Sequence, residues 1–279
     1  MKQTVKTLIL EFVAGNGPSH IKEVHLKVAE FKPEVPQHTV RARLSEMSRG
    51  DNLEEKLDSF GSGFYGLYEE DKGMCSVVSY PNRGPWGDSR YRGNCSGHLV
   101  KDLILRFKCQ SVFDPAEGSG TVRDVVTGIN KYRNKNIYFE GRDLKKGWDI
   151  LTCELPEKQF DMVFYHPPYH NIIKYSDDPK DLSNCHTIEE FERKLNQSTE
   201  KLFQTIKPGG IIAILIGDKR KNGQYYPLLR TLLTNQNIGQ LKAVIIKLQY
   251  NCSSDNRTYS SNNPFLIPIK HEYCIVFQK

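Results

Sequence analysis

Apolar residues recur at helical spacing through the first fifty residues of the chain. A first helix is predicted from Val5, Leu8, Ile9, Phe12 and Val13, and it ends at the sequence Gly15-Asn16-Gly17-Pro18. A second helix, with Ser19 as its expected N-cap, carries Ile21, Val24, Leu26 and Val28 and stops near Pro33. A third helix begins near Pro36 and turns Val40, Leu44 and Met47 inward.

Beyond Gly50-Asp51-Asn52, two short apolar segments at 53–57 and 64–68 flank a turn-rich sequence, which predicts a two-stranded wing. Three helices followed by a hairpin predict a winged helix-turn-helix domain over residues 1–72. In that geometry the third helix enters a DNA major groove. The candidate contacts are Gln37, Thr39, Arg41 and Arg43. Dimerisation or protein contact is the alternative use of such a module.

Residues 73–90 are rich in Gly, Pro, Ser, Asn and Asp, which predicts a linker or crossing loop. From residue 91 onward, helical patterns at 99–107, 122–129, 188–206 and 228–233 alternate with strand-like runs at 111–113, 136–139, 162–164, 211–216, 243–248 and 273–277. This alternation predicts an α/β domain over 91–279, a doubly wound, mostly parallel sheet of Rossmann-like type with helices on both faces.

Charge and composition narrow the class of protein. The net charge of the 279 residues is +6, and it divides into −2 over residues 1–72 and +8 over the rest, so a polyanion would be attracted mainly by the larger part. No stretch has the length of a membrane span and no secretion signal is visible, which favours a soluble, cytoplasmic protein. The seven cysteines form no Cys-x-x-Cys pair, so neither a disulfide framework nor a metal site is expected.

An acidic, Gly-rich turn is the first candidate for chemistry. Asp114-Pro115 ends a strand, and Gly118-Ser119-Gly120-Thr121 leads into a helix, which places backbone N–H groups and a close-approach surface at a helix N-terminus. The turn lacks a phosphate-binding Lys and dinucleotide spacing, so an amino-acid-bearing nucleoside with a cationic ammonium facing Asp114 fits better. Asp143, in competition with Glu140, is the candidate for the ribose diol, and Asp149 for an adenine amino group.

The second candidate is the sequence His166-Pro167-Pro168-Tyr169, about fifty residues later at the end of an apolar run. The prolines remove N–H donors, so the Pro167 carbonyl is a pure acceptor, and the Tyr169 ring can stack on a base. A neutral His166 nitrogen and that carbonyl would draw the hydrogens of an exocyclic amino group and expose its lone pair to a methyl group. Activity should therefore fall in acid.

With these two motifs in this order, residues 91–279 resemble the DNA methyltransferases that methylate adenine N6 or cytosine N4. Asp114 to Thr121 is similar to their cofactor motif and His166 to Tyr169 to their Asp/Asn/Ser-Pro-Pro-Tyr motif. The segment 93–97, with Asn94 and Ser96, is similar to the part that closes over the methionine end of S-adenosylmethionine. His166 departs from the family pattern, which bears on both the target base and full activity.

The resemblance implies S-adenosylmethionine as cofactor, DNA as substrate and a flipped target base, with adenine N6 slightly ahead of cytosine N4. The resemblance also allows a restriction endonuclease as partner. The sequence identifies neither such a partner nor the oligomeric state. The loops 171–186 and 251–268 and the winged helix remain as DNA contacts. Alternatives are a methyltransferase acting on RNA or a protein amide, and a catalytically silent DNA-binding regulator. Cytosine C5 methylation is disfavoured because the chain has no Pro-Cys nucleophile.

Overall fold

The computed structural model describes residues 4–16, 19–49, 57–61, 63–67, 74–81, 83–133, 135–250 and 265–279. Its contacts divide the chain into two units. One comprises Met1–Gly73, Asn82–Pro85 and Thr127–Lys135, and the other comprises Met74–Pro81, Trp86–Val126 and Asn136–Lys279. In the described part of the chain, no helix has both the length and the apolar character of a membrane span.

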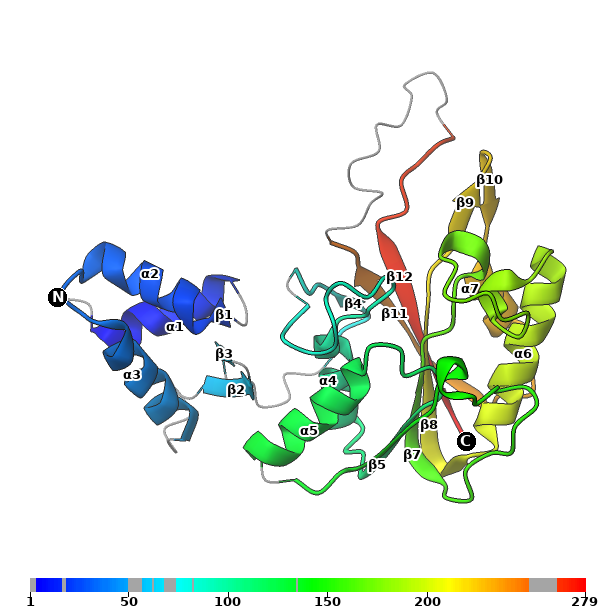
Figure 1. The fold of residues 1–279 in the computed structure, drawn as a ribbon, viewed down its shortest axis with the longest axis horizontal. Coiled ribbons are helices and arrows are strands. Elements are labelled where there is room, and N and C mark those ends of the chain that lie inside the picture. Colours follow the sequence, from blue (N-terminus) through cyan, green and yellow to red (C-terminus); the bar gives the residue numbers. More distant parts are fainter. Residues whose placement is uncertain are drawn as a thin grey trace. The chain divides into compact units, whose positions relative to one another are not determined.

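The first stretch of the first unit, Met1–Gly73, is called here the N-terminal unit, and its described residues form three helices and a small sheet (Figure 1). The helices are α1 (Val5–Asn16), α2 (Ile21–Phe31) and α3 (Gln37–Arg49), and the antiparallel sheet has the order β1 (Ser19–His20), β3 (Phe64–Leu67), β2 (Leu57–Gly61). Val40, Leu44 and Met47 of α3 are buried, as the helical spacing predicts, and they pack in one apolar cluster with residues of α1 and α2.

Two expectations for this unit differ from the structure. Ser19 is not the N-cap of α2, because it lies in β1 opposite Tyr65. His20 takes that place: its Nδ1 accepts from the Lys22 N–H, and the Glu23 carboxylate accepts from the His20 N–H. Leu26 is 67% exposed and does not join the core. Three expected segments lie outside the described residues: the turns at Gly17-Pro18 and 50–52, and the strand at 53–57 except for Leu57.

The larger unit is built on a seven-stranded, mostly parallel sheet. Its order is β4 (Val77–Val78), β11 (Gln240–Leu248), β12 (His271–Gln278), β8 (Ile206–Ile216), β7 (Phe160–Tyr165), β5 (Ser111–Asp114) and β6 (Tyr138–Gly141). Strand β12 is antiparallel to both its neighbours, and all other pairs are parallel. The predicted α/β alternation therefore corresponds to this sheet.

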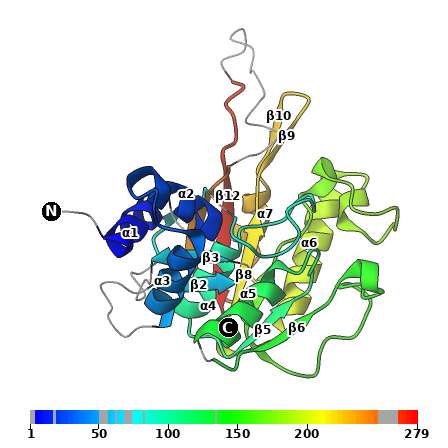
Figure 2. The ribbon, with the colours of Figure 1, turned by 60° about the vertical axis from the view of Figure 1, so that its left-hand side comes forward.

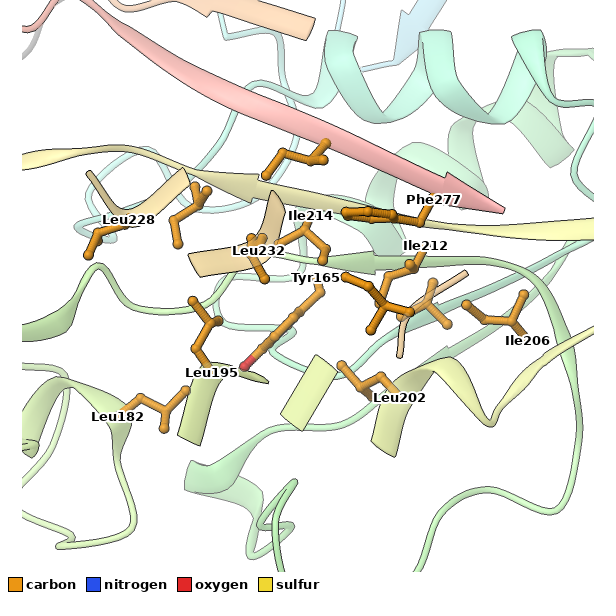
Figure 3. Packing of buried hydrophobic residues seen from close by; sticks show 14 of the residues in the cluster. Tyr165, Leu182, Leu195, Leu202, Ile206, Ile212, Ile214, Leu228, Leu232 and Phe277 are labelled. Carbon is orange, nitrogen blue, oxygen red and sulfur yellow. The ribbon is translucent and has the colours of Figure 1, made fainter. Parts of the chain in front are cut away.

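Helices cover both faces of the sheet. The helix α4 (Gly97–Arg106) and the start of α5 (Thr121–Arg133) lie on one side, and α6 (Ile188–Phe203) and α7 (Leu228–Leu233) lie on the other (Figure 1). On the α6 side, Leu195 and Leu202 point toward Tyr165 and Ile212 of the sheet (Figure 3). Each of these side chains is at most 2% exposed, so this contact buries most of the apolar face of α6.

Several segments differ from the expected boundaries. The predicted linker contains β4, a two-residue edge strand that pairs with β11. The helix expected to reach residue 206 ends at Phe203, and Ile206 already pairs with Phe160 as the first residue of β8.

A hairpin of β9 (Lys219–Lys221) and β10 (Gln224–Tyr226), which continues beyond β8, was not predicted (Figure 2). Neither were the short 3-10 helices η1 (Leu144–Lys146), η2 (His170–Ile172) and η3 (Leu182–Asn184). The expected DNA-contact loop 251–268 lies outside the described residues up to 264.

Candidate active site

The two sequence motifs meet at one end of the sheet. Asp114 is the last residue of β5, His166 follows β7 directly, and β5 and β7 are parallel neighbours. A pocket at this end encloses about 970 Å³ of empty space, part of it open to solvent. The predicted site residues that line it are Asn94, Asp114, Pro115, Gly118, Ser119, Thr121, Asp143, Asp149, His166 and Pro168. Ser96, Gly120, Pro167 and Tyr169 are not among its lining residues.

The glycine turn takes its shape from two residues with positive φ. Gly118 has φ of 51° and Gly120 has φ of 82°, a region where a side chain is strained. A Cβ added at Gly120 would also overlap the Arg123 guanidinium. The Gly120 N–H donates to the Glu117 carbonyl at 2.8 Å, which closes the turn just before α5 begins at Thr121. Gly120 thus shapes the turn, whereas Gly118 also lines the pocket.

Asp114 carries an unusual carboxyl group at the base of this turn. It is 3% exposed, and its Oδ1 accepts from the Ala116 N–H at 3.1 Å. Burial raises the pKa of Asp114 to about 8; the Ala116 hydrogen bond lowers it, while the nearby charges of Glu117 and Asp143 raise it further and Lys146 lowers it. A cation placed against Asp114 would relieve this unfavourable environment.

The two other predicted carboxylates line the pocket and are also bound to backbone. Asp143 accepts from the Gly118 N–H at 2.8 Å and from the Lys145 N–H at 2.9 Å, so it ties the glycine turn to η1. Asp149 accepts from the Leu151 N–H and the Thr152 hydroxyl. Glu140, the competitor of Asp143, bonds to Arg142 and does not line the pocket.

Glu117 is a lining residue that the sequence analysis missed. Its carboxylate is 4% exposed and lies between Arg123, at 2.5 Å, and Lys146. A Cβ on Gly141 would approach this carboxylate to 2.7 Å, so Gly141 makes room for it. The only signal in the sequence is its place inside the Asp-Pro-x-x-Gly turn, at a position that the motif leaves variable.

The segment before α4 forms another wall of the pocket, through Tyr91, Gly93, Asn94 and Cys95. The Thr121 hydroxyl donates to Asn94 Oδ1, which joins this segment to the start of α5. Ser96 lies at the N-cap of α4, 3% exposed, and its Oγ has no hydrogen-bond partner among the described residues. The rings of Tyr91 and Tyr175 stack with centroids 6.1 Å apart, and both line the pocket.

His166 lies half-buried in the pocket wall, and Tyr169 lies behind it. The Tyr169 hydroxyl is 2.9 Å from His166 Nε2 and donates to Glu272 Oε1 at 2.9 Å. The Tyr169 ring packs against Gly217, where an added Cβ would come within 2.9 Å of it. The structure thus brings His166 and Pro168 to the pocket, whereas the tyrosine expected to stack on a base lies outside the wall and is held by its hydroxyl.

The predicted DNA contacts lie together on α3 of the N-terminal unit. Gln37, Arg41 and Arg43 are exposed and Thr39 is half-buried. Arg43 is paired with Glu46 at 2.5 Å. For metals, no group of three or more His, Cys, Asp or Glu side chains in the described ranges is placed to hold an ion.

No family model and no curated protein matches this chain. Among solved structures, a protein of Thermus thermophilus assigned as a DNA modification methylase is 21% identical to this chain, with a TM-score of 0.34. The match covers 47% of this chain and 52% of that protein, so this chain spans about half the length of the matched protein. The N-methyltransferase NodS of Bradyrhizobium japonicum WM9 is 10% identical, with a TM-score of 0.34, over 65% of this chain and 95% of its own. A Listeria monocytogenes protein assigned as a class I S-adenosylmethionine-dependent methyltransferase is 14% identical, with a TM-score of 0.37, over 66% of this chain and 58% of its own. At these TM-scores and identities, none of the three similarities establishes an activity for this chain.

Proposed function

We propose that this protein transfers a methyl group from S-adenosylmethionine to an exocyclic amino group of a flipped base in DNA, with adenine N6 ahead of cytosine N4. The observation that carries the proposal is the meeting of the two motifs: Asp114 and the glycine turn line the same pocket as His166. A methyl donor and an acceptor must share one pocket, and the ends of adjacent parallel strands provide it.

The pocket fits the cofactor by the chemistry of its groups. Asp114 is buried with a pKa of about 8, an environment that favours a cationic ligand group. Trp148, Ile150 and Phe164 give the pocket an apolar wall suited to a nucleoside. Asp143 would accept from the ribose and Asp149 from the adenine amino group, each through lone pairs beyond those bound to backbone. When bound, the sulfonium group supplies an electrophilic methyl.

The chain's own residues would then prepare the amino nitrogen. Its lone pair is delocalised into the base, so an acceptor on one of its hydrogens raises its reactivity. His166, which lines the pocket directly after β7, can accept in this way through a neutral ring nitrogen. Tyr91 and Tyr175 offer rings at the pocket wall for base stacking, whereas Tyr169 is not among the lining residues.

We propose DNA as the polymer because of the N-terminal unit and the charge distribution. The three helices and the antiparallel sheet have the element order expected of a winged helix, and α3 exposes Gln37, Arg41 and Arg43. The net charge of +8 over residues 73–279 favours a polyanionic substrate. A base inside a duplex cannot reach a pocket at the ends of strands, so the proposal includes flipping of the target nucleotide.

Mass spectrometry of nucleosides from DNA and RNA, and of peptides from protein, tests the proposal. The full chain and S-adenosylmethionine are incubated separately with duplex DNA, with RNA and with protein. We expect N6-methyladenine or N4-methylcytosine in DNA alone, and His166→Ala should reduce its formation by about 100-fold or more. Tyr138→Phe, which alters an exposed side chain of β6 that does not line the pocket, is the control. Methylation confined to RNA or protein, or absent while DNA binding persists, would replace this proposal by one of the alternatives.

A further inference from the structure

A continuous chain of polar side chains leads from the pocket into the protein. His166 Nε2 is 2.9 Å from the Tyr169 hydroxyl, which is 2.9 Å from Glu272 Oε1, and Glu272 Oε2 is 2.7 Å from Lys247 Nζ. These residues come from the end of β7, the loop after it, and the paired strands β12 and β11. Lys247 and Glu272 are direct cross-strand neighbours, and their side chains are 10% and 12% exposed.

The direction of each hydrogen bond follows from the charges. Burial alone would raise the pKa of Glu272, but the charges of Lys247 and His166 and the hydrogen bonds from Lys247 and Tyr169 hold it at about 2, so this carboxylate is ionised. Burial and Glu272 raise the pKa of Tyr169 well above its ordinary value, so the phenol keeps its proton. An ionised carboxylate can only accept, and therefore the Tyr169 O–H donates to Glu272.

One tautomer of His166 agrees with this arrangement. Since the single phenol proton points at Glu272, the Tyr169 oxygen faces His166 as an acceptor. His166 Nε2 must then carry the hydrogen, and in the neutral ring Nδ1 carries the lone pair. The opposite tautomer would set two lone pairs against each other across 2.9 Å.

We propose that Glu272 and Lys247 are positioning residues which, through Tyr169, fix His166 in the tautomer whose Nδ1 accepts a hydrogen of the target amino group. The catalytic consequence rests on the proposed methyl transfer. In the opposite tautomer His166 would present an N–H to the amino hydrogens, which repels the substrate group that it should activate.

The same chain balances charge after transfer. When the amino nitrogen forms its bond to the methyl carbon, the bond between that carbon and the cofactor sulfur breaks and its electron pair stays on the sulfur. The nitrogen is then cationic and must lose a proton. That N–H bond breaks, its electron pair stays on the nitrogen, and His166 Nδ1 takes the proton. The imidazolium so formed donates through Nε2 to Tyr169, whose phenol is bonded to the Glu272 carboxylate, so the new positive charge lies near a fixed negative one. A histidine can thereby act as the acceptor at the position where the methyltransferases that this sequence resembles have Asp, Asn or Ser.

Nitrogen-15 NMR of the histidine rings in the full chain reads the tautomer directly, without substrate. The His166 signals are assigned by their loss in His166→Gln. At a pH where His166 is neutral, we expect the wild type to show a protonated Nε2 and an unprotonated Nδ1. In Glu272→Gln the new amide can donate to the Tyr169 oxygen, which frees the phenol proton for Nε2, so the signals should change to those of the Nδ1–H form.

Kinetics supply the second measurement. In Glu272→Gln and in Tyr169→Phe, which keeps the ring and deletes the hydroxyl, kcat should fall on the order of 100-fold while KM for the cofactor changes less than about threefold. Tyr138→Phe, an exposed tyrosine of β6, is the matched control. If Glu272→Gln leaves Lys247 unpaired and fails to fold, Lys247→Met with Glu272→Gln removes both charges.

The outcomes separate this inference from the proposed function. A wild type in the Nδ1–H form, or a tautomer and kcat that survive in Glu272→Gln, overturns the positioning role even if DNA is methylated. An Nε2–H wild type that switches in Glu272→Gln upholds the role of Glu272, even if no nucleic acid is methylated and the proposed substrate is wrong.

Discussion

Asp114 shows how one residue can couple ligand binding to pH. Burial, and to a lesser extent the charges of Glu117 and Asp143, disfavour the ionised form and raise the pKa of Asp114 to about 8. A carboxyl group whose pKa is raised in the folded state stabilises the protein while protonated, and this contribution is lost as pH rises from about 4 toward 8. Binding of a cation reverses the preference, because the cation interacts best with the ionised carboxylate.

Cofactor binding should therefore release protons. At pH 7 the free protein holds Asp114 mostly protonated, so binding of S-adenosylmethionine should release close to one proton, and the affinity should rise between about pH 6 and pH 8. Calorimetry in two buffers of different ionisation enthalpy measures this release. In Asp114→Asn the release should disappear, with affinity at least about tenfold weaker. An unchanged proton release in this variant would show that another group titrates.

Although Asp114→Asn should weaken cofactor binding, it should stabilise the cofactor-free protein. The amide introduced by Asp114→Asn keeps an oxygen for the Ala116 N–H and carries no charge to bury, so the melting temperature at pH 8 should rise by about 2 °C or more, equivalent to ~1 kcal/mol. At pH 4 the variant and the wild type should melt within about 1 °C of each other. Thermal unfolding measured at pH 8 and at pH 4 checks whether the substitution raises the melting temperature at the higher pH alone.

Among the elements, the segment 91–96 and the loop after β7 depend on each other. Gly93 has φ of 80°, and a Cβ there would overlap the Tyr175 hydroxyl. Gly93→Ala should therefore displace Tyr175 from the pocket and weaken cofactor binding at least about tenfold. Gly223→Ala in the β9–β10 hairpin is a matched control, because Gly223 has φ of 79° with nothing within 4 Å of an added Cβ. Both variants should lose about 1 to 2 kcal/mol of stability from strained φ.

A fluorescent titration of cofactor against both variants would distinguish strain from overlap. Equal loss of affinity in Gly93→Ala and Gly223→Ala would mean that strain in the backbone, and not the Tyr175 contact, controls the pocket. We expect the Gly223→Ala affinity to stay within about twofold of the wild type.

Elements with a strong local pattern were predictable and those that depend on distant partners were not. The spacing of Val40, Leu44 and Met47 specifies the inner face of α3 without reference to other segments, and all three are buried. Ser19 reads as a helix cap in isolation, but β3, more than forty residues later, recruits it into a strand. Likewise β4 forms where β11 pairs with it, and its two valines favour a strand but are too short a run to specify one alone.

Residues of the site were likewise predictable where their signal is local and unpredictable where it depends on distant partners. Asp114 and His166 were each expected at the end of a strand because alternating strands and helices of this kind form a parallel sheet. The hydrogen bond of the Tyr169 hydroxyl could not be predicted, because its partner Glu272 lies 103 residues further along the chain. Glu117 was missed because its burial depends on Arg123, Lys146 and the space left by Gly141.

At the scale of the whole molecule, the proposal assigns recognition of DNA partly to the N-terminal unit and chemistry to the larger one. Arg41 is exposed on α3, and we expect Arg41→Ala to weaken binding of duplex DNA. The slope of log K against the logarithm of the salt concentration should become shallower by about one. Cofactor affinity should be unchanged, because the pocket lies in the larger unit. Lys22→Ala, which removes an equal charge from the exposed surface of α2, is the control and should leave the salt slope within about 0.3 of the wild type. Equal effects of the two substitutions in a fluorescence anisotropy titration over several salt concentrations would indicate that the unit attracts DNA by charge alone, without docking α3 in a groove.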